Sequence, residues 1–276
     1  MATPPNVRLD LPSRPENVLL VRESLTGLAE AAGIAGADLS DVRTAATEAA
    51  NNVVLHAYPG GEGPMEVEID IAEGFLSVCV RDHGVGLPRE AELQDGEGIG
   101  LPVIRALTHR VDFMQTPGGG AEVRMEFATP GVRDLPAGEA SEVDLLADLE
   151  GGENAVGVSI APPALARPVL PRLLTVLAAR AHFSTDRISD IVLLADALVA
   201  QGAGSLSGSE LRLSVSVEPR VIGLHLGPLR SGRAGELLSD SEVQGLGPIL
   251  AKLADAHEVL ARDSHDVLTL QLQDRR

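Results

Sequence analysis

The chain has 276 residues, enough for one or two domains, and 44% of them are hydrophobic, so each domain can bury a core. Aromatic residues make up 2% and the formal net charge is −18, which counts against base-stacking platforms and against nucleic acid and anionic membranes as direct partners. Cys79 is the one cysteine, which excludes an intrachain disulfide and fits a reducing compartment, and the N-terminus lacks an apolar leader, so we expect a cytoplasmic protein.

Hydrophobic periodicity in the first half predicts hairpins interleaved with helices. The clearest hairpin joins two alternating strands through a tight turn at Glu73-Gly74. In chain order we predict a strand at 6–11, helices at 15–32 and about 38–57, strands at 65–72 and 75–82, a glycine-rich loop at 83–98, a helix at about 99–108, and strands at about 110–116 and 121–128. Clustered hairpins predict an α+β two-layer sandwich of a mixed sheet with helices on one face.

Residues 130–154 interrupt this pattern. The stretch is acidic and bounded by Pro-Gly and Gly-Gly, which predicts a solvated linker with a short helix at 141–148. The element order then restarts, with a strand at 155–160, helices at 163–181 and 187–201, strands at 210–217 and 220–226, a helix at about 245–254, and strands at 256–262 and 266–272. We therefore predict a tandem duplication with domains at 1–129 and 155–276.

Three polar side chains on the second predicted helix, Glu48, Asn52 and His56, are spaced at i, i+4 and i+8, so they project from one face. Asn52 offers a neutral oxygen to a Mg²⁺ ion that also keeps waters and phosphate oxygens. Glu48 could accept a proton from an attacking hydroxyl or water. The alternative interpretation is the ordinary solvated face of an amphipathic helix.

A glycine turn follows the second strand of the hairpin. Asp82 ends this apolar strand, where its carboxylate could accept a hydrogen bond from an exocyclic amine such as that of adenine. Gly84 and Gly86 let the backbone approach a flat ligand closely. The alternative is a glycine turn that Asp82 merely caps.

A third segment carries glycines directly before a helix. Gly96, Gly98 and Gly100 precede Leu101, and backbone N–H groups at a helix N-terminus suit phosphate. The pattern does not directly follow a strand, as the dinucleotide-binding fingerprint requires, so by itself it is weak.

In this order, the three segments resemble the N, G1 and G2 boxes of the Bergerat ATP-binding fold (GHKL superfamily), and the stretch at 38–58 is most similar to the RsbW and SpoIIAB anti-sigma factor serine kinases. The resemblance covers about residues 6–128. It implies an ATP and Mg²⁺ site with Glu48 as catalytic base, Asn52 as Mg²⁺ ligand and Asp82 as adenine anchor. It also implies that the nucleotide-binding residues include His56, Gly84, Gly86, Gly96, Gly98, Gly100 and Leu101.

The family's activity implies an anti-sigma factor that holds a sigma factor inactive and uses ATP to phosphorylate a serine or threonine of a STAS-domain antagonist. The alternative is a nucleotide-gated regulator that binds ATP and a partner but transfers nothing. The short lid favours this alternative, because the 11 residues between Gly86 and Gly98 contain one basic side chain, Arg89.

The second half repeats the predicted elements without the chemical side chains. Aligning the two Ser-Asp pairs at the starts of the second helices places Ala197 opposite Glu48 and Gln201 opposite Asn52, and residues 224–230 contain no carboxylate. We interpret this half as a degenerate, pseudo-ATPase domain. Since kinases of this type act as homodimers, we expect the two halves to pair as an intrachain pseudo-dimer, or whole chains to pair as a homodimer.

Overall fold

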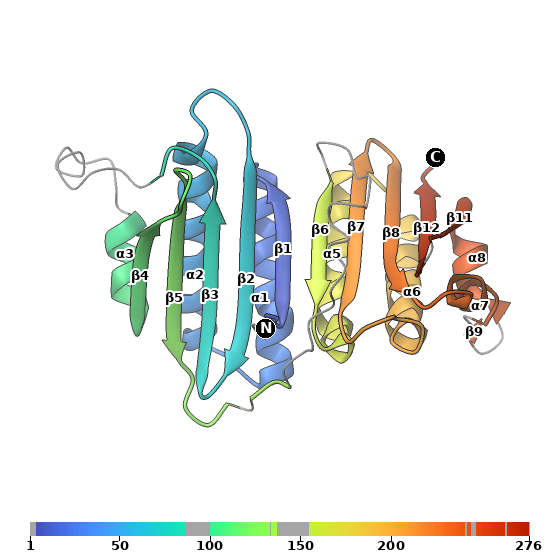
Figure 1. Cartoon of the computed structure of the whole chain (residues 1–276), viewed down its shortest axis with the longest axis horizontal. Helices are drawn as coiled ribbons and strands as arrows, with labels where there is room; N and C mark the ends of the chain where they lie inside the picture. Colours follow the sequence, from blue (N-terminus) through green and yellow to red (C-terminus); the bar gives the residue numbers. More distant parts are fainter. Residues whose placement is uncertain are drawn as a thin grey trace. The chain divides into compact units, whose positions relative to one another are not determined.

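The computed structural model describes residues 4–86, 100–132, 134–136, 155–240, 242–243, 247–262 and 264–275, and it divides into two compact units (Figure 1). The first unit is Asn6–Leu135, and the second contains Pro136–Arg276. The first unit reaches past the predicted boundary at residue 129, because Leu135 is buried and its N–H donates to the Ile71 carbonyl at 3.1 Å. The short helix predicted at 141–148 lies outside the described residues.

The first unit has the predicted α+β architecture, with helices behind one sheet (Figure 1). Its sheet has the order β1-β2-β3-β5-β4, and every neighbouring pair is antiparallel, so the prediction of a mixed sheet was wrong. The chain passes from β3 to β4 through one helix, and the two strands run in the same direction. They are not neighbours in the sheet, because β5 pairs with both of them and runs antiparallel to both. The elements are β1 Val7–Pro12, η1 Pro15–Asn17, α1 Val18–Ala32, α2 Ala37–Asn52, η2 Val53–Ala57, β2 Pro64–Ala72, β3 Phe75–Asp82, α3 Gly100–Leu107, β4 Arg110–Gln115 and β5 Ala121–Ala128.

Alternation along the strands builds the core of this unit. In β1, Val7, Leu9 and Leu11 are buried while the residues between them are half-buried, as a period of two predicts for a sheet covered on one face. Each such Val or Leu stabilises the fold by about 1.5–3 kcal/mol. The β2–β3 turn follows from its residues, because Glu73 and Gly74 both have positive φ, as a two-residue hairpin loop requires.

The second helix differs from the prediction at its end. The α-helix stops at Asn52, and Val53–Ala57 forms a π-helical turn. In such a turn the chain advances more residues per revolution, so the α-helical spacing ends at Asn52. Leu55, 70% exposed, and His56 therefore turn to the surface.

The second unit repeats the topology of the first. Its strand order, β6-β7-β8-β12-β11, is that of the first unit, again with antiparallel pairs. Helix α7 and the β9–β10 ladder were not predicted, although the buried Ala234, Leu237 and Leu238 of α7 have helical spacing. The elements are β6 Val156–Ile160, η4 Pro163–Leu165, α5 Ala166–Arg180, α6 Thr185–Gly202, β7 Leu211–Glu218, β8 Val221–Leu229, α7 Arg233–Asp240, β9 Glu242–Val243, β10 Gly247–Pro248, α8 Ile249–Leu253, β11 Ala256–Ala261 and β12 Asp266–Gln273.

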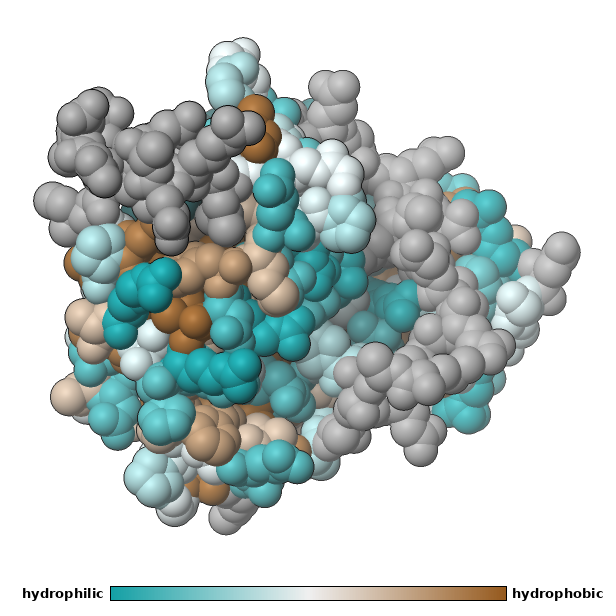
Figure 2. Space-filling model, turned by 60° about the vertical axis from the view of Figure 1, so that its left-hand side comes forward, coloured by the Kyte–Doolittle hydropathy of each residue, from teal (hydrophilic) through white to brown (hydrophobic). Residues whose placement is uncertain are grey.

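The surface on the α3–β4 side of the first unit intersperses hydrophilic and hydrophobic residues over its described part (Figure 2). Scattered apolar residues of this kind, such as Met114 at 42% exposure, are normal for a protein surface. A search of the described residues finds no helix with the length and apolar character needed to span a bilayer.

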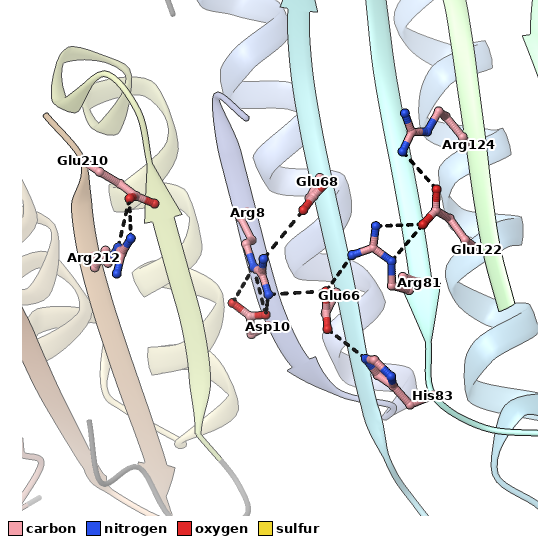
Figure 3. Close-up of polar contacts among 10 residues, drawn as sticks. All are labelled: Arg8, Asp10, Glu66, Glu68, Arg81, His83, Glu122, Arg124, Glu210 and Arg212. Carbon is pink, nitrogen blue, oxygen red and sulfur yellow. Dashed lines mark hydrogen bonds and ion pairs between the residues drawn. The ribbon is translucent and has the colours of Figure 1, made fainter. Parts of the chain in front are cut away.

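Charged side chains form a connected network on the strands of the first unit, mainly β2, β3 and β5 (Figure 3). At its centre, Arg81 Nη1 lies 3.0 Å from Glu66 Oε2 and its Nη2 lies 2.7 Å from Glu122 Oε2. Arg8 and Arg124 extend the network from either side, at 3.3 Å to Glu66 and 3.0 Å to Glu122. A separate ion pair, Arg212–Glu210 at 2.8 Å, is found in the second unit (Figure 3). The network ties four strands of the first unit together, β1, β2, β3 and β5.

Arg81→Met should lower the free energy of unfolding at pH 7 by about 1–3 kcal/mol, because Glu122 and Glu66 lose charged hydrogen bonds. Partial burial acts to raise the pKa of both carboxyls, but partners outweigh it and hold each pKa below its usual range: His83, Arg8 and Arg81 at Glu66, and Arg81 and Arg124 at Glu122. Groups with a depressed pKa in the folded state stabilise above the unfolded value of about 4.3, and this stability is lost as the pH falls.

The measurement is urea unfolding of wild type and Arg81→Met at pH 7 and across the acid range. The difference between the two proteins should shrink as the pH falls below about 4.3, where the glutamates are protonated in the unfolded chain. A difference that stays constant with pH would show that the ionised glutamates do not carry the effect of Arg81.

Candidate functional site

The N-terminus of α3 lies against the two key side chains of α2. A Cβ atom placed on Gly100 would be 3.2 Å from Asn52 Oδ1 and 3.2 Å from Glu48 Oε2. Glu48 and Asn52 are half-buried and point to the same place, as their spacing predicted. The first backbone N–H groups of α3 have no partner within the helix, and they carry the positive end of its dipole to this place. A carboxylate, an amide oxygen and anion-binding N–H groups therefore converge here.

At the end of β3, Asp82 is held by its own turn. The carboxylate is buried, with 4% of the residue exposed, and its Oδ1 accepts hydrogen bonds from the N–H groups of Gly84 at 2.9 Å and Ala121 at 3.2 Å. The second oxygen, Oδ2, has no hydrogen-bond partner among the residues that the structure describes. Asp82 can therefore cap its turn with one oxygen and accept a ligand's amine with the other, so the two readings of the sequence are compatible.

Two positions of this turn require glycine, because backbone oxygens of other segments lie where a Cβ atom would be. A Cβ on Gly84 would lie 2.0 Å from the Ala57 carbonyl oxygen, and one on Gly86, which has φ +83, would lie 2.7 Å from the Gly119 oxygen. Val85 N–H donates to the Ala57 carbonyl at 2.9 Å. The turn after Asp82 thus packs tightly against the π-helical end of α2, so the position of the Asp82 carboxylate is coupled to that of the helix carrying Glu48 and Asn52.

Beside Glu48, the surface of the first unit is hollowed into an open pocket of about 400 Å³ between α1 and α2. Arg22 and Arg43 line it, with the hydroxyl-bearing Ser40, Thr44 and Thr47, and Glu48 lies at its edge. Arg43 Nε is buried and has no hydrogen-bond partner in the described part of the chain. Sequence reasoning missed Arg43, whose position one turn before Thr47 on the same helix was the available signal.

The structure brings some of the predicted site residues together and leaves others apart. It brings Glu48, Asn52 and Gly100 together, and it groups Asp82 with Gly84 and Gly86. His56 is exposed within the π-helical turn, where the α-helical spacing that placed it beside Asn52 no longer applies, and Leu101 is half-buried in the first turn of α3. The residues that lie outside the described part are Gly96 and Gly98.

The donor set fits a magnesium ion better than a transition metal. No group of three or more His, Cys, Asp or Glu side chains that could hold a metal occurs among the described residues. Asn52 Oδ1 and the adjacent Glu48 carboxylate supply only one or two oxygen ligands. Mg²⁺ commonly accepts so few, because it keeps several waters and takes further oxygens from phosphates.

Comparisons with known proteins find similarity to an ATPase domain and to serine-protein kinases. Residues 11–127 match the family model of the histidine kinase-like ATPase domain. The serine-protein kinase RsbW of Listeria innocua serovar 6a is 40% identical over 90 residues, which are 32% of this chain and 57% of that protein, so the chain spans little more than half of this relative. RsbW of Bacillus thuringiensis strain Al Hakam is 26% identical over 126 residues, 41% of this chain and 79% of that protein. Crystal form I of TP0453 overlays with a TM-score of 0.35 at 10% identity, which supports no conclusion.

Proposed function

Because the first unit of this chain carries a histidine kinase-like ATPase domain similar to the RsbW serine-protein kinases, we propose that the protein is an ATP-dependent serine/threonine kinase and anti-sigma factor. The observation that carries the proposal is the place of Glu48. Its carboxylate faces the N-terminus of α3 and also lies at the edge of the open pocket between α1 and α2. A base in this place can reach both a nucleotide and an incoming acceptor hydroxyl.

Each group of the site has a chemical role in this proposal. Asp82 Oδ2 accepts the adenine amine, and the N–H groups at the start of α3 receive phosphate oxygens. Glu48 takes the proton of the acceptor hydroxyl as that oxygen bonds to the γ-phosphorus, and the bond from phosphorus to the leaving oxygen breaks to release ADP. A Mg²⁺ ion held by Asn52 would neutralise charge on the phosphates when bound.

The pocket beside Glu48 indicates the kind of partner that reaches the site. Arg22 and Arg43 give it positive charge within a chain of net charge −18, so an acidic segment carrying a serine or threonine suits it. We propose a STAS-domain antagonist as the phosphorylated partner and a sigma factor as the second partner. Incubation with purified STAS proteins and γ-labelled ATP tests this, and ATP binding without transfer would favour the nucleotide-gated regulator.

We infer that the second unit is a degenerate copy that binds no nucleotide. It has the same strand order, yet Ala197 of α6, 4% exposed, stands where the first unit has Glu48. Counted from their hairpin turns, Asp82 is the eighth residue of β3 and Pro228 the eighth of β8, so the base-binding carboxylate is replaced as well. Without these groups, the second unit retains the fold and lacks the chemistry.

Calorimetric titration with Mg-ATP should therefore give one bound nucleotide per chain. Gln201→Ala in the second unit is the matched control for Asn52→Ala in the first, because the two amides occupy corresponding places on α6 and α2. We expect the Asn52 variant to weaken Mg-ATP binding and the Gln201 variant to leave it unchanged. Two equivalent sites per chain, or equal effects of the two variants, would contradict the degenerate second unit.

A further inference from the structure

Tyr58 joins three segments that meet around the Asp82 turn, which we define as residues 82–86. Its hydroxyl donates a hydrogen bond to the Pro64 carbonyl at 2.6 Å and accepts one from the His83 N–H at 2.9 Å. Its ring lies flush on the backbone of Gly63, where a Cβ would be 2.2 Å from Tyr58 Cε1. Tyr58 directly follows the π-helical turn, so one side chain connects the end of the catalytic helix, the start of β2 and the Asp82 turn.

The hydroxyl acts next to the base-binding carboxylate. The N–H that donates to the Tyr58 hydroxyl belongs to His83, the residue after Asp82. The next residue, Gly84, donates its own N–H to Asp82 Oδ1. A second contact, His83 Nε2 to Glu66 Oε1 at 2.9 Å, holds the same residue from β2, but the His83 side chain is 53% exposed and the contact is correspondingly weak (Figure 3). Of the two attachments, Tyr58 is the one that holds the backbone of the turn, whereas Glu66 holds only the His83 side chain.

We propose that Tyr58 is a positioning residue for base recognition: its hydroxyl holds the Asp82 turn so that Asp82 Oδ2 meets an exocyclic amine and rejects a carbonyl. The inference rests on the proposed nucleotide site and adds to it the residue that sets its preference for adenine over guanine. Guanine presents a carbonyl oxygen where adenine has its amine, so a carboxylate fixed at that point attracts one base and repels the other.

The electrostatics keep the hydroxyl in its donating form. Burial raises the pKa of Tyr58, the His83 N–H acts to lower it, and the carboxylates of Asp82 and Glu66 raise it further, so the net pKa lies above the ordinary value of about 10. The chain has one tyrosine and no tryptophan, so the ultraviolet absorbance of the phenol reports on Tyr58 alone. Ionisation at the pH of free tyrosine would show that the hydroxyl is not held, and would overturn the proposal.

The decisive variant is Tyr58→Phe, which keeps the ring on Gly63 and removes both hydrogen bonds. We expect ATP affinity to fall roughly three- to tenfold, as the loss of one or two such bonds implies, while GTP affinity stays within about twofold. The preference for ATP over GTP should fall by the same factor. Hydrogen exchange of the backbone amides in residues 82–86 should become faster.

Thr26→Val is the matched control, because it also removes a hydroxyl that donates to a backbone carbonyl, that of Arg22 at 2.8 Å, at a distance in sequence from the turn. It should change neither the ATP preference nor exchange in the Asp82 turn. If wild-type protein binds no ATP, the proposed function fails. If wild type prefers ATP and Tyr58→Phe keeps both the affinity and the preference, the inference about Tyr58 fails while the proposed function stands.

Discussion

Replacing Asp82 by Asn should lower ATP affinity about ten- to a hundredfold while leaving the fold intact. The amide oxygen of Asn can still accept the Gly84 and Ala121 N–H groups that Oδ1 now accepts, so the turn keeps its cap. The amide nitrogen replaces Oδ2, and as a donor it cannot accept the adenine amine. A hydrogen bond to a charged acceptor contributes about 1.5–3 kcal/mol, which corresponds to the expected loss.

Calorimetric ATP titration measures this effect, and thermal unfolding checks the fold. Asp70→Asn is the matched control, since it neutralises a half-buried carboxylate on the neighbouring strand β2 of the same unit. Burial raises the pKa of Asp70, and hydrogen bonds from the backbone of Asn6 and Ile71 partly offset this. Asp70 lies within β2, outside the set of candidate site residues. Equal ATP affinity of wild type and Asp82→Asn would remove Asp82 from base recognition.

The second large effect is expected for Glu48→Gln, which should reduce phosphoryl transfer about 10²–10⁴-fold and leave ATP affinity nearly unchanged. Glutamine keeps the size of the side chain beside Gly100 but cannot take the acceptor's proton. The nucleotide's contacts in the ground state are assigned to Asp82, Asn52 and the start of α3. An interaction that exists only in the transition state changes kcat rather than binding.

Single-turnover phosphorylation of a STAS-domain partner, with ATP affinity measured in parallel, tests the role of Glu48. Asp41→Asn serves as the control, because Asp41 is an exposed carboxylate two turns earlier on the same helix. It should leave transfer unchanged. If Glu48→Gln transfers phosphate at the wild-type rate, Glu48 is not the base. It would then belong to the ordinary solvated face of an amphipathic helix, the alternative interpretation of its spacing.

Local patterns in the sequence determined most of the elements and the membership of the candidate site. Alternation at a period of two located β2 and β3, the Glu73-Gly74 pair located their turn, and both properties depend only on neighbouring residues. The same holds for Glu48 and Asn52, whose spacing of four residues on an α-helix is enough to align them.

Contacts between segments far apart in the chain decided the rest. The π-helical turn after Asn52 ends at Ala57, whose carbonyl accepts the Val85 N–H, and no pattern within residues 38–57 signals that contact. The antiparallel sheet arises because β5 inserts between β3 and β4. The two hydrogen bonds of the Tyr58 hydroxyl, to the Pro64 carbonyl and from the His83 N–H, also join segments whose pairing depends on the tertiary structure. Short-range periodicity encodes which face of an element is buried, whereas the neighbour that buries it depends on packing of the whole unit.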